Sequence, residues 1–163
     1  MGRAVRKTGV MPRPLAADDL ERLLEIEQAN GRHGRRRIFE RRLLAMRRSP
    51  DDFVNLGVVA DGRLAGFLFA RILRGEFGQA EPAATFDFIG IDPGSRGQGH
   101  GRRLMTALHA ALQERGIHHL HSQAEWTSHA LVRFFDAAGF TLGRRVVLER
   151  SVAEPLVEAT NDV

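Results

Sequence analysis

The spacing of hydrophobic and polar positions changes several times along the chain and predicts a series of helices and strands. Apolar residues that recur every three or four positions predict four amphipathic helices, over residues 17–31, 34–50, 100–115 and 127–140. Apolar runs rich in β-branched and aromatic residues predict strands, over residues 10–14, 53–73, 85–91, 117–126 and 144–152. Asp61-Gly62 divides the longest run into a hairpin with a type I′ turn.

The order of these elements predicts a mixed α/β (α+β) sheet covered by helices. No internal repeat or linker divides the sequence, so we expect one domain over residues 1–163. The polar ends, residues 1–9 and 153–163, are expected to be poorly ordered tails.

Composition excludes several classes of function. The chain has 163 residues and no cysteine, which excludes disulfides, thiolate metal sites and a cysteine nucleophile. No apolar run approaches 18 residues, so no membrane span or membrane partner is expected. The N-terminal segment has no apolar core of the secretory type, and we expect a cytoplasmic protein.

The charge is positive but nearly balanced. Twenty-four basic residues face 20 acidic ones, a formal net charge of +4, and Lys7 is the only lysine. The excess of arginine is typical of a genome-wide bias in composition. No recognition motif or stacking aromatic residues accompany the arginines, so nucleic-acid binding ranks last among the alternatives.

A glycine-rich turn joins the predicted strand over residues 85–91 to the helix over residues 100–115. Glycine permits positive φ and close backbone approach to a ligand. The first N–H groups of a helix have no intrahelical partner and favour an anion. Arg96, Arg102 and Arg103 add positive charge to the same turn, which predicts a phosphate-binding loop.

The spacing of this loop decides between known phosphate binders. It lacks the lysine and Ser/Thr of a P-loop, and its glycines do not have the dinucleotide-binding spacing. The run Arg96–Gly101 fits R/Q-x-x-G-x-G/A, the pyrophosphate motif of the GNAT superfamily of acyl-CoA-dependent N-acyltransferases. "FIGIDP", "GRRLMTALHAALQERGI" and "FFDAAGF" resemble the family's central strand, following helix and final helix-to-strand turn.

This resemblance covers residues 85–142 in detail and implies a fold and a cosubstrate. The fold is a mixed, mostly antiparallel central sheet, flanked by helices and splayed between its fourth and fifth strands. Acetyl-CoA is the implied acyl donor, with its pantetheine arm paired to the fourth strand and its pyrophosphate on the N–H groups of residues 97–102. The implied cofactor-binding residues are Ile89, Ile91, Arg96, Gly97, Gln98, Gly99, His100, Gly101, Arg102, Ser128 and Phe135.

The chain departs from the family at two positions that the family uses for catalysis. Ser128 stands where an asparagine usually holds the pantetheine, and Phe135 stands where a tyrosine is the usual general acid; the chain has no tyrosine. Ser128, His129 or water would then protonate the thiolate, unless it leaves unaided. The alternative is a non-catalytic acyl-CoA-binding protein.

Two carboxylates are candidates for the general base. Asp87 lies within the apolar fourth strand, and Glu125 is expected at the end of the fifth. Burial of an acid needs a compensating interaction, so Asp87 is a base, a residue on the open face of the sheet, or the partner of a nearby arginine. The predicted catalytic residues are therefore Asp87, Glu125 and Ser128.

The histidines give no metal prediction. His118, His119 and His121 are close in sequence, but His118 and His119 cannot share one face of a strand. We expect no metal. His121 is a candidate proton relay, and His100 is expected to be solvated.

The acceptor is expected to be a small-molecule or protein amine. Residues 32–42 hold six arginines where the family forms its acceptor wall, which favours an anionic acceptor. The alternative is a solvated helix face paired with nearby acids. A homodimer through the last strand, with Val146, Val147 and Leu148, is a family-level expectation.

Overall fold

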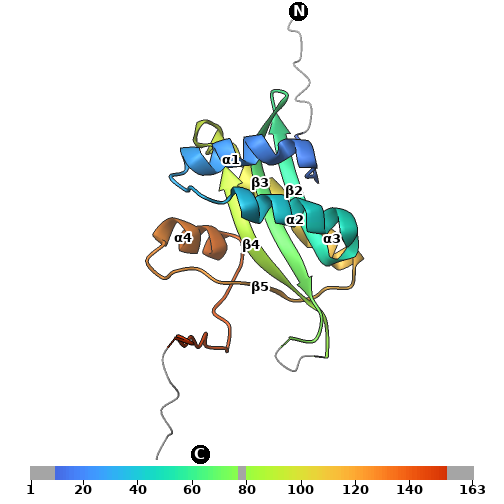
Figure 1. The fold of residues 1–163 in the computed structure, drawn as a ribbon, viewed down its shortest axis with the longest axis vertical. Coiled ribbons are helices and arrows are strands. Elements are labelled where there is room, and N and C mark those ends of the chain that lie inside the picture. Colours follow the sequence, from blue (N-terminus) through green and yellow to red (C-terminus); the bar gives the residue numbers. More distant parts are fainter. Residues whose placement is uncertain (1–9, 77–79, 154–163) are drawn as a thin grey trace, which may run out of the picture.

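The computed structural model describes residues 10–76 and 80–153. Its helices are α1 (Leu20–Ala29), α2 (Arg36–Arg48), α3 (His100–Glu114) and α4 (His129–Ala137), with short 3-10 turns at Ala17–Asp19, Pro50–Asp52 and Pro93–Ser95. Its strands are β1 (Pro12–Pro14), β2 (Phe53–Ala60), β3 (Arg63–Leu73), β4 (Ala83–Ile91) and β5 (Leu120–Ser122). Figure 1 shows these elements around a central sheet. The helices and the first four strands confirm the sequence prediction.

One sheet with the order β1-β2-β3-β4-β5 runs through the described residues. The first four strands pair antiparallel, and β4 pairs with β5 in parallel. Asp61 and Gly62 both have positive φ, 51° and 74°, which confirms the predicted turn between β2 and β3. The mixed, mostly antiparallel sheet predicted from the sequence is therefore correct.

Strands β4 and β5 are paired at one end only. Their register covers Ala84–Phe86 against Leu120–Ser122, and β4 continues to Ile91 without β5 beside it. We call the point after Phe86 and Ser122 the opening. The predicted splay between the fourth and fifth strands lies here.

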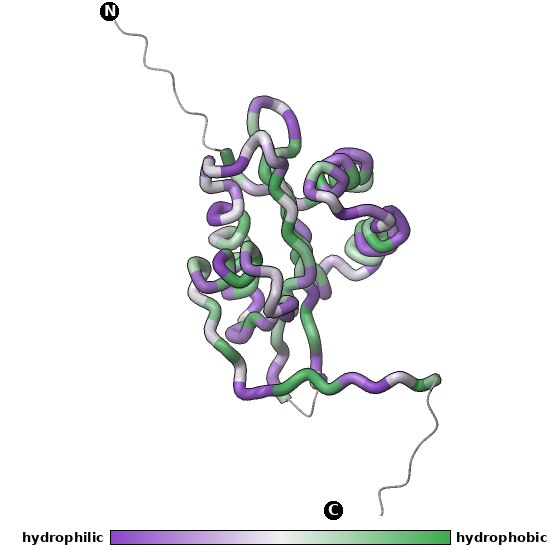
Figure 2. Tube along the Cα trace, turned by 90° about the vertical axis from the view of Figure 1, so that its left-hand side faces the viewer, coloured by the Kyte–Doolittle hydropathy of each residue, from purple (hydrophilic) through white to green (hydrophobic). Residues whose placement is uncertain are grey.

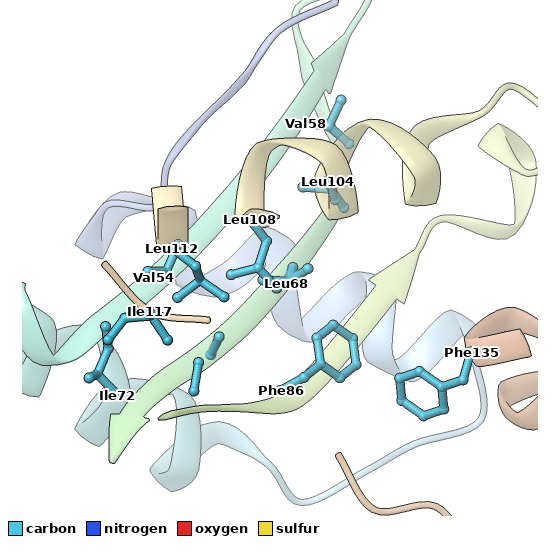
Figure 3. Packing of buried hydrophobic residues seen from close by; sticks show 12 residues of the cluster. Val54, Val58, Leu68, Ile72, Phe86, Leu104, Leu108, Leu112, Ile117 and Phe135 are labelled. Atoms are coloured by element: carbon cyan, nitrogen blue, oxygen red, sulfur yellow. The ribbon is translucent and has the colours of Figure 1, made fainter. Parts of the chain in front are cut away.

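Each face of the sheet carries its own hydrophobic core. On one face, Leu104, Leu108 and Leu112 of α3 pack on the strands, with Phe135 of α4 beside Phe86 (Figure 3). The i, i+4, i+8 spacing places these leucines on one side of the helix. On the other face, α1 and α2 bury Leu23, Ile26, Phe39 and Leu43 against the sheet. Figure 2, which views the molecule at 90° to Figure 1, shows helices on both sides of the strands.

The predicted last strand is wrong. Residues 144–152 form no strand, and β5 is shorter than the predicted 117–126. The side chains of Val146, Val147 and Leu148 are exposed, and Figure 2 shows this segment running away from the rest of the molecule. A strand needs a partner for its backbone groups, and a three-residue β5 offers little edge for pairing.

The predicted tails lie outside the described residues, apart from Ala153, which is exposed and in no helix or strand. No helix in the described ranges is long and apolar enough to cross a lipid bilayer.

Candidate functional site: the cleft beside strand β4

A cleft of about 1460 Å³ begins where β4 and β5 separate. It is lined by the end of β4, the glycine-rich loop, the first turns of α3, strand β5 and helix α4, with Asn30 and Arg32 from the end of α1 and the loop after it. The volume exceeds the ~300–1,000 Å³ of ordinary small-molecule sites. The cleft is therefore large enough for an extended ligand.

The free edge of β4 forms one wall of the cleft. Alternate residues of a strand direct their backbone groups to opposite neighbours. The carbonyl oxygens of Ile89 and Ile91 therefore face the cleft rather than β3. Arg32 Nη1 donates to the Ile89 oxygen at 3.1 Å, and Asn30 Nδ2 donates to the Ile91 oxygen at 3.0 Å. Both predicted cofactor-binding isoleucines line the cleft, but their carbonyls already accept hydrogen bonds from side chains.

The glycine-rich loop has the backbone that the motif predicts. Gly97 and Gly99 have φ values of 74° and 76°, a region that side-chain-bearing residues rarely adopt. Asp92 fixes the start of the loop, because its Oδ1 accepts from the Gly94 N–H at 2.8 Å and its Oδ2 pairs with Arg22. The Gly94 bond and then Arg22 lower the pKa of Asp92. This aspartate therefore has a structural role in the loop.

Helix α3 begins beside the loop with its N-terminal N–H groups free of intrahelical partners. Gly99 is the N-cap, and its carbonyl accepts the first helical bond from the Arg103 N–H at 3.0 Å. The N–H groups of residues 100–102 therefore remain for capping or a ligand. A Cβ on Gly101 would lie 3.1 Å from the Phe134 ring. Gly101 thus permits the close approach of α4.

Three polar residues of the motif lie at this helix end. Arg96 and Arg102 line the cleft, and Arg96 Nη2 donates to Asn30 Oδ1. The Gln98 side chain is exposed, and the backbone carbonyl of Gln98 accepts from Arg103 Nη1 at 2.6 Å. Because the guanidinium of Arg96 contacts the same asparagine that holds β4, the loop is tied to the strand edge.

The prediction that His100 is solvated is wrong. Its side chain lies on the inward face of α3, four residues before Leu104, and the residue is 3 % exposed. Nδ1 is 3.4 Å from Arg103 Nη1, while Nε2 is buried and has no partner among the described residues. Burial and then the Arg103 charge lower the pKa of His100. The imidazole is therefore neutral at pH 7.

Helix α4 presents a different aromatic residue from the one predicted. Phe135 is in the core, against Phe86 and Phe140, with ring centroids 5.4 and 4.8 Å away. Phe134 is the aromatic residue that lines the cleft. Phe135 is thus not a cleft residue, because the rotation of α4 turns it toward the sheet.

The three predicted catalytic residues are separated. Ser128 is the N-cap of α4 and lines the cleft. Glu125 does not end a strand; it is exposed in a turn, and its carbonyl accepts from the Ser128 N–H at 2.8 Å. Asp87 is on the other face of the sheet, where its carboxylate binds Arg42 and Arg71. The structure thus shows Asp87 paired with arginine, which was one of the expected arrangements.

The histidines of β5 and the residues before it also line the cleft. The rings of His119 and His121 are nearly parallel, with centroids 6.3 Å apart. Burial, then Arg145 and His119, lower the pKa of His121. In the described part of the chain, no three His, Cys, Asp or Glu residues form a group that could hold a metal ion.

Sequence reasoning missed a buried carboxylate beside the cleft. Glu27 of α1 is 1 % exposed, and its oxygens accept from Arg32 at 3.1 Å and from Arg35 at 2.7 Å. We call these three residues the Glu27 cluster. The available signal was an acid within the apolar stripe of α1, one residue after Ile26. Through Arg32 this cluster reaches the β4 edge.

A sequence model of the "Acetyltransferase (GNAT) family" matches residues 20–140. A mycothiol acetyltransferase of Thermobispora bispora is 32 % identical over 80 residues, which are 49 % of this chain and 27 % of that protein. The chain thus spans about a quarter of the length of this curated relative.

Solved structures share the fold. An aminoglycoside N-acetyltransferase in complex with CoA is 19 % identical, with a TM-score of 0.75 over 92 % of this chain and 99 % of that one. A ribosomal-protein-alanine N-acetyltransferase from Brucella melitensis biovar Abortus 2308 is 19 % identical, with a TM-score of 0.69 over 87 % and 99 % of the two chains.

Proposed function

The chain belongs to the acetyltransferase (GNAT) family, and we propose that it transfers an acetyl group from acetyl-CoA to a primary amine. The observation that carries this proposal is the cleft itself. A free strand edge, a loop with two positive-φ glycines and a helix N-terminus line one continuous space. No aspartate or glutamate is among the described residues that line it, which favours a multiply charged anion.

The donor is proposed to bind along β4 with its phosphates at the loop. The N–H groups of residues 97–102 would hold the pyrophosphate, with Arg96 and Arg102 adding charge. The pantetheine arm would pair with Ile89 and Ile91 as an added strand. About 13 Å of strand separates Ile91 from Asp87, so the thioester would lie near the opening.

The reaction is direct attack of the neutral amine on the thioester carbonyl. A C–N bond forms, the C–S bond breaks, CoA leaves as its thiol, and the amine loses one proton. Ser128 and His121 are the proposed proton carriers in the cleft, and Ser128 would protonate the leaving sulfur. The lowered pKa of His121 keeps its imidazole able to accept a proton at pH 7. The roles of Asp87 and Glu125 as bases stay predictions.

Comparison proteins bear on the acceptor. A small-molecule amine is the class that the aminoglycoside acetyltransferase neighbours suggest. We propose this class for the chain and place the protein in the cytoplasm. The predicted homodimer rested on a last strand that the structure lacks, although the apolar residues named for it are exposed.

Calorimetric titration with acetyl-CoA and CoA tests the donor site. Gly99→Glu should weaken binding at least ~100-fold, because it adds a carboxylate at the anion site and strains a φ of 76°. The matched control is Gly116→Glu, at the other end of α3 with a φ of 67° and open space around it. Equal binding by wild type and Gly99→Glu would contradict the proposed site.

Release of CoA thiol with a panel of amines then tests the transfer. Saturable binding without turnover would favour the non-catalytic binder, which the missing tyrosine motivates. Phe134→Tyr would place a phenol in the cleft, whereas Phe135→Tyr would bury it in the core. A gain in turnover for Phe134→Tyr alone would show that protonation of the thiolate limits the reaction.

A further inference from the structure

The α1–α2 face of the sheet carries a second carboxylate held by two guanidinium groups. Arg71 of β3 donates from Nε and Nη2 to the two oxygens of Asp87, at 2.8 and 3.0 Å. Arg42 of α2 donates from Nη2 to the same carboxylate. We call Arg42, Arg71 and Asp87 the Asp87 cluster. One negative charge faces two positive ones, so the cluster keeps one net positive charge.

The Asp87 cluster lies at the opening. Asp87 is the first residue of β4 after its pairing with β5 ends at Phe86. It is also the extra residue of a β-bulge, since Phe69 pairs with Phe88 and Ala70 pairs with Phe86. A bulge redirects a side chain and ends regular pairing. The bulge thus carries the carboxylate to the face opposite α3 at the point where the sheet opens.

One guanidinium edge in this cluster is open to a ligand. Arg71 uses its Nε and Nη2 edge for Asp87, which leaves the Nη1 edge turned away from that carboxylate. The Arg71 side chain is 46 % exposed. Arg42 Nη1 is buried and has no hydrogen-bond partner among the described residues. The Arg42 guanidinium lies 5.2 Å from the Phe53 ring centroid, so the exposed edge of Arg71 is the one that a ligand can reach.

The surroundings of the cluster favour an acceptor with an apolar part. Phe88 follows Asp87 and is partly buried, and the Arg35 guanidinium lies 5.1 Å from its ring centroid. The Glu27 cluster, also with two arginines on one carboxylate, therefore adjoins the Asp87 cluster. Among the described residues, the Glu76 carboxylate also acts on the Arg71 charge. With it counted, the two clusters together still carry a net positive charge.

We infer that the acceptor amine carries a carboxylate, bound by the outer edge of Arg71 and drawn by the excess charge of the Asp87 cluster. This inference rests on the proposed acetyl transfer, which brings the thioester to the opening from the α3 face. The acceptor then approaches from the α1–α2 face. A planar carboxylate matches the guanidinium fork with two parallel hydrogen bonds. In this arrangement Asp87 holds Arg71 in position.

Paired acceptors that differ only in this group test the inference. Amino acids and their carboxamides, such as phenylalanine and phenylalaninamide, are compared by CoA release with wild type and Arg71→Ala. The ratio of kcat/KM for acid to amide is taken within each protein and then compared between proteins, so that intrinsic amine reactivity cancels. We expect Arg71→Ala to lower this ratio at least ~10-fold, and Arg71→Lys to lower it less. Arg74→Ala, at an exposed pair with Asp52, should leave it unchanged.

The result that overturns the inference is an unchanged ratio, or equal losses for acid and amide. Failure of the proposed function is recognised separately, as absence of CoA release with every amine. In that case the acids and amides are titrated calorimetrically into the protein–CoA mixture. Binding of the acid that Arg71→Ala removes supports the carboxylate site, and absence of that binding overturns it.

Discussion

The two faces of the sheet present positive charge to the opening in different ways. On the α3 face, the charge comes from backbone N–H groups and from Arg96 and Arg102, with no carboxylate among the described residues that line the cleft. On the α1–α2 face, four arginines are held in pairs, two by the buried carboxylate of Glu27 and two by the partly buried carboxylate of Asp87. The first face is proposed to bind a multiply charged anion, and the second keeps only a small excess of charge.

This difference separates binding from stability. Charge on the α3 face is not needed to hold the fold, so changes there should act mainly on donor affinity. Charge on the α1–α2 face neutralises carboxylates with little exposure, so changes there should act mainly on the free energy of unfolding. Arg32 is the exception, because it also donates to the cleft edge of β4. Four predictions test this separation.

The largest expected effect is the loss of stability in Glu27→Gln. Removing the charge of a buried carboxylate leaves Arg32 and Arg35 without their counter-ion, which should lower the free energy of unfolding by about 3 kcal/mol. Urea unfolding measures this free energy. The affinity for CoA, measured by calorimetry, should change less than ~3-fold. Glu21→Gln, at an exposed pair with Arg36, is the control and should show no measurable change. A fully stable Glu27→Gln would remove the contrast between the faces.

The second prediction concerns the contact between α3 and α4. Gly101→Ala places a Cβ 3.1 Å from the Phe134 ring, and this ring must move into the cleft to relieve the contact. CoA affinity should fall about 10-fold, while the unfolding free energy changes by less than ~1 kcal/mol, because alanine is also the better helix former. Calorimetry and urea unfolding on one preparation give both numbers. A stability loss without an affinity loss would assign Gly101 to packing alone.

The donor side of this comparison could be predicted from the sequence, because glycine requirements are local. Gly97 and Gly99 need positive φ for the loop to turn into α3, and that need is visible in the motif. The acceptor side depends on tertiary contacts. Glu27 can be buried because Arg32 and Arg35, five and eight residues further along the chain, bind its carboxylate. Asp87 meets its arginines because of a β-bulge, which no local sequence pattern predicts.

Two further errors have the same origin. Phe134 and Phe135 are chemically equal, and only the rotation of α4 on the sheet decides which ring faces the cleft. The run Val146–Leu148 has strand propensity, but strand formation depends on a partner edge. The error at His100 is different. His100 follows the spacing of Leu104 and Leu108, so the helical periodicity of the sequence was enough to predict that it is buried.

The third prediction uses the hydrogen bond between the two faces. Arg32 donates to the Ile89 carbonyl, the group that the pantetheine arm is proposed to pair with. Arg32→Ala removes this competing donor, and since one hydrogen bond is worth ~0.5–1.5 kcal/mol, CoA should bind about 3- to 10-fold more tightly. Titration calorimetry measures the affinity, with Arg37→Ala, an exposed residue of α2 outside both clusters, as control. Weaker binding would instead make Arg32 a ligand of the donor.

The smallest expected effect is a dependence of stability on pH from His100. Burial lowers its pKa in the folded protein below the unfolded value of about 6.5. The unfolded chain therefore takes up the proton first as pH falls. The stabilising contribution is complete above pH 6.5 and is lost as pH falls through the folded pKa. The loss between pH 7 and 5 should be less than ~1 kcal/mol.

His100→Leu should flatten this part of the profile, since leucine continues the inward stripe of α3 and does not titrate. Urea unfolding at several pH values gives the difference in unfolding free energy between wild type and variant, and the exposed His33→Gln should follow wild type.

The affinity for CoA, measured over the same pH range, extends this test to the donor site. If the phosphates lie at the α3 N-terminus, their charge favours protonated His100, and CoA should bind more tightly to wild type as pH falls below 6.5 while His100→Leu lacks this gain. An identical pH profile of CoA affinity in both proteins would place the bound charge away from this helix end and would remove the electrostatic argument for the α3 face.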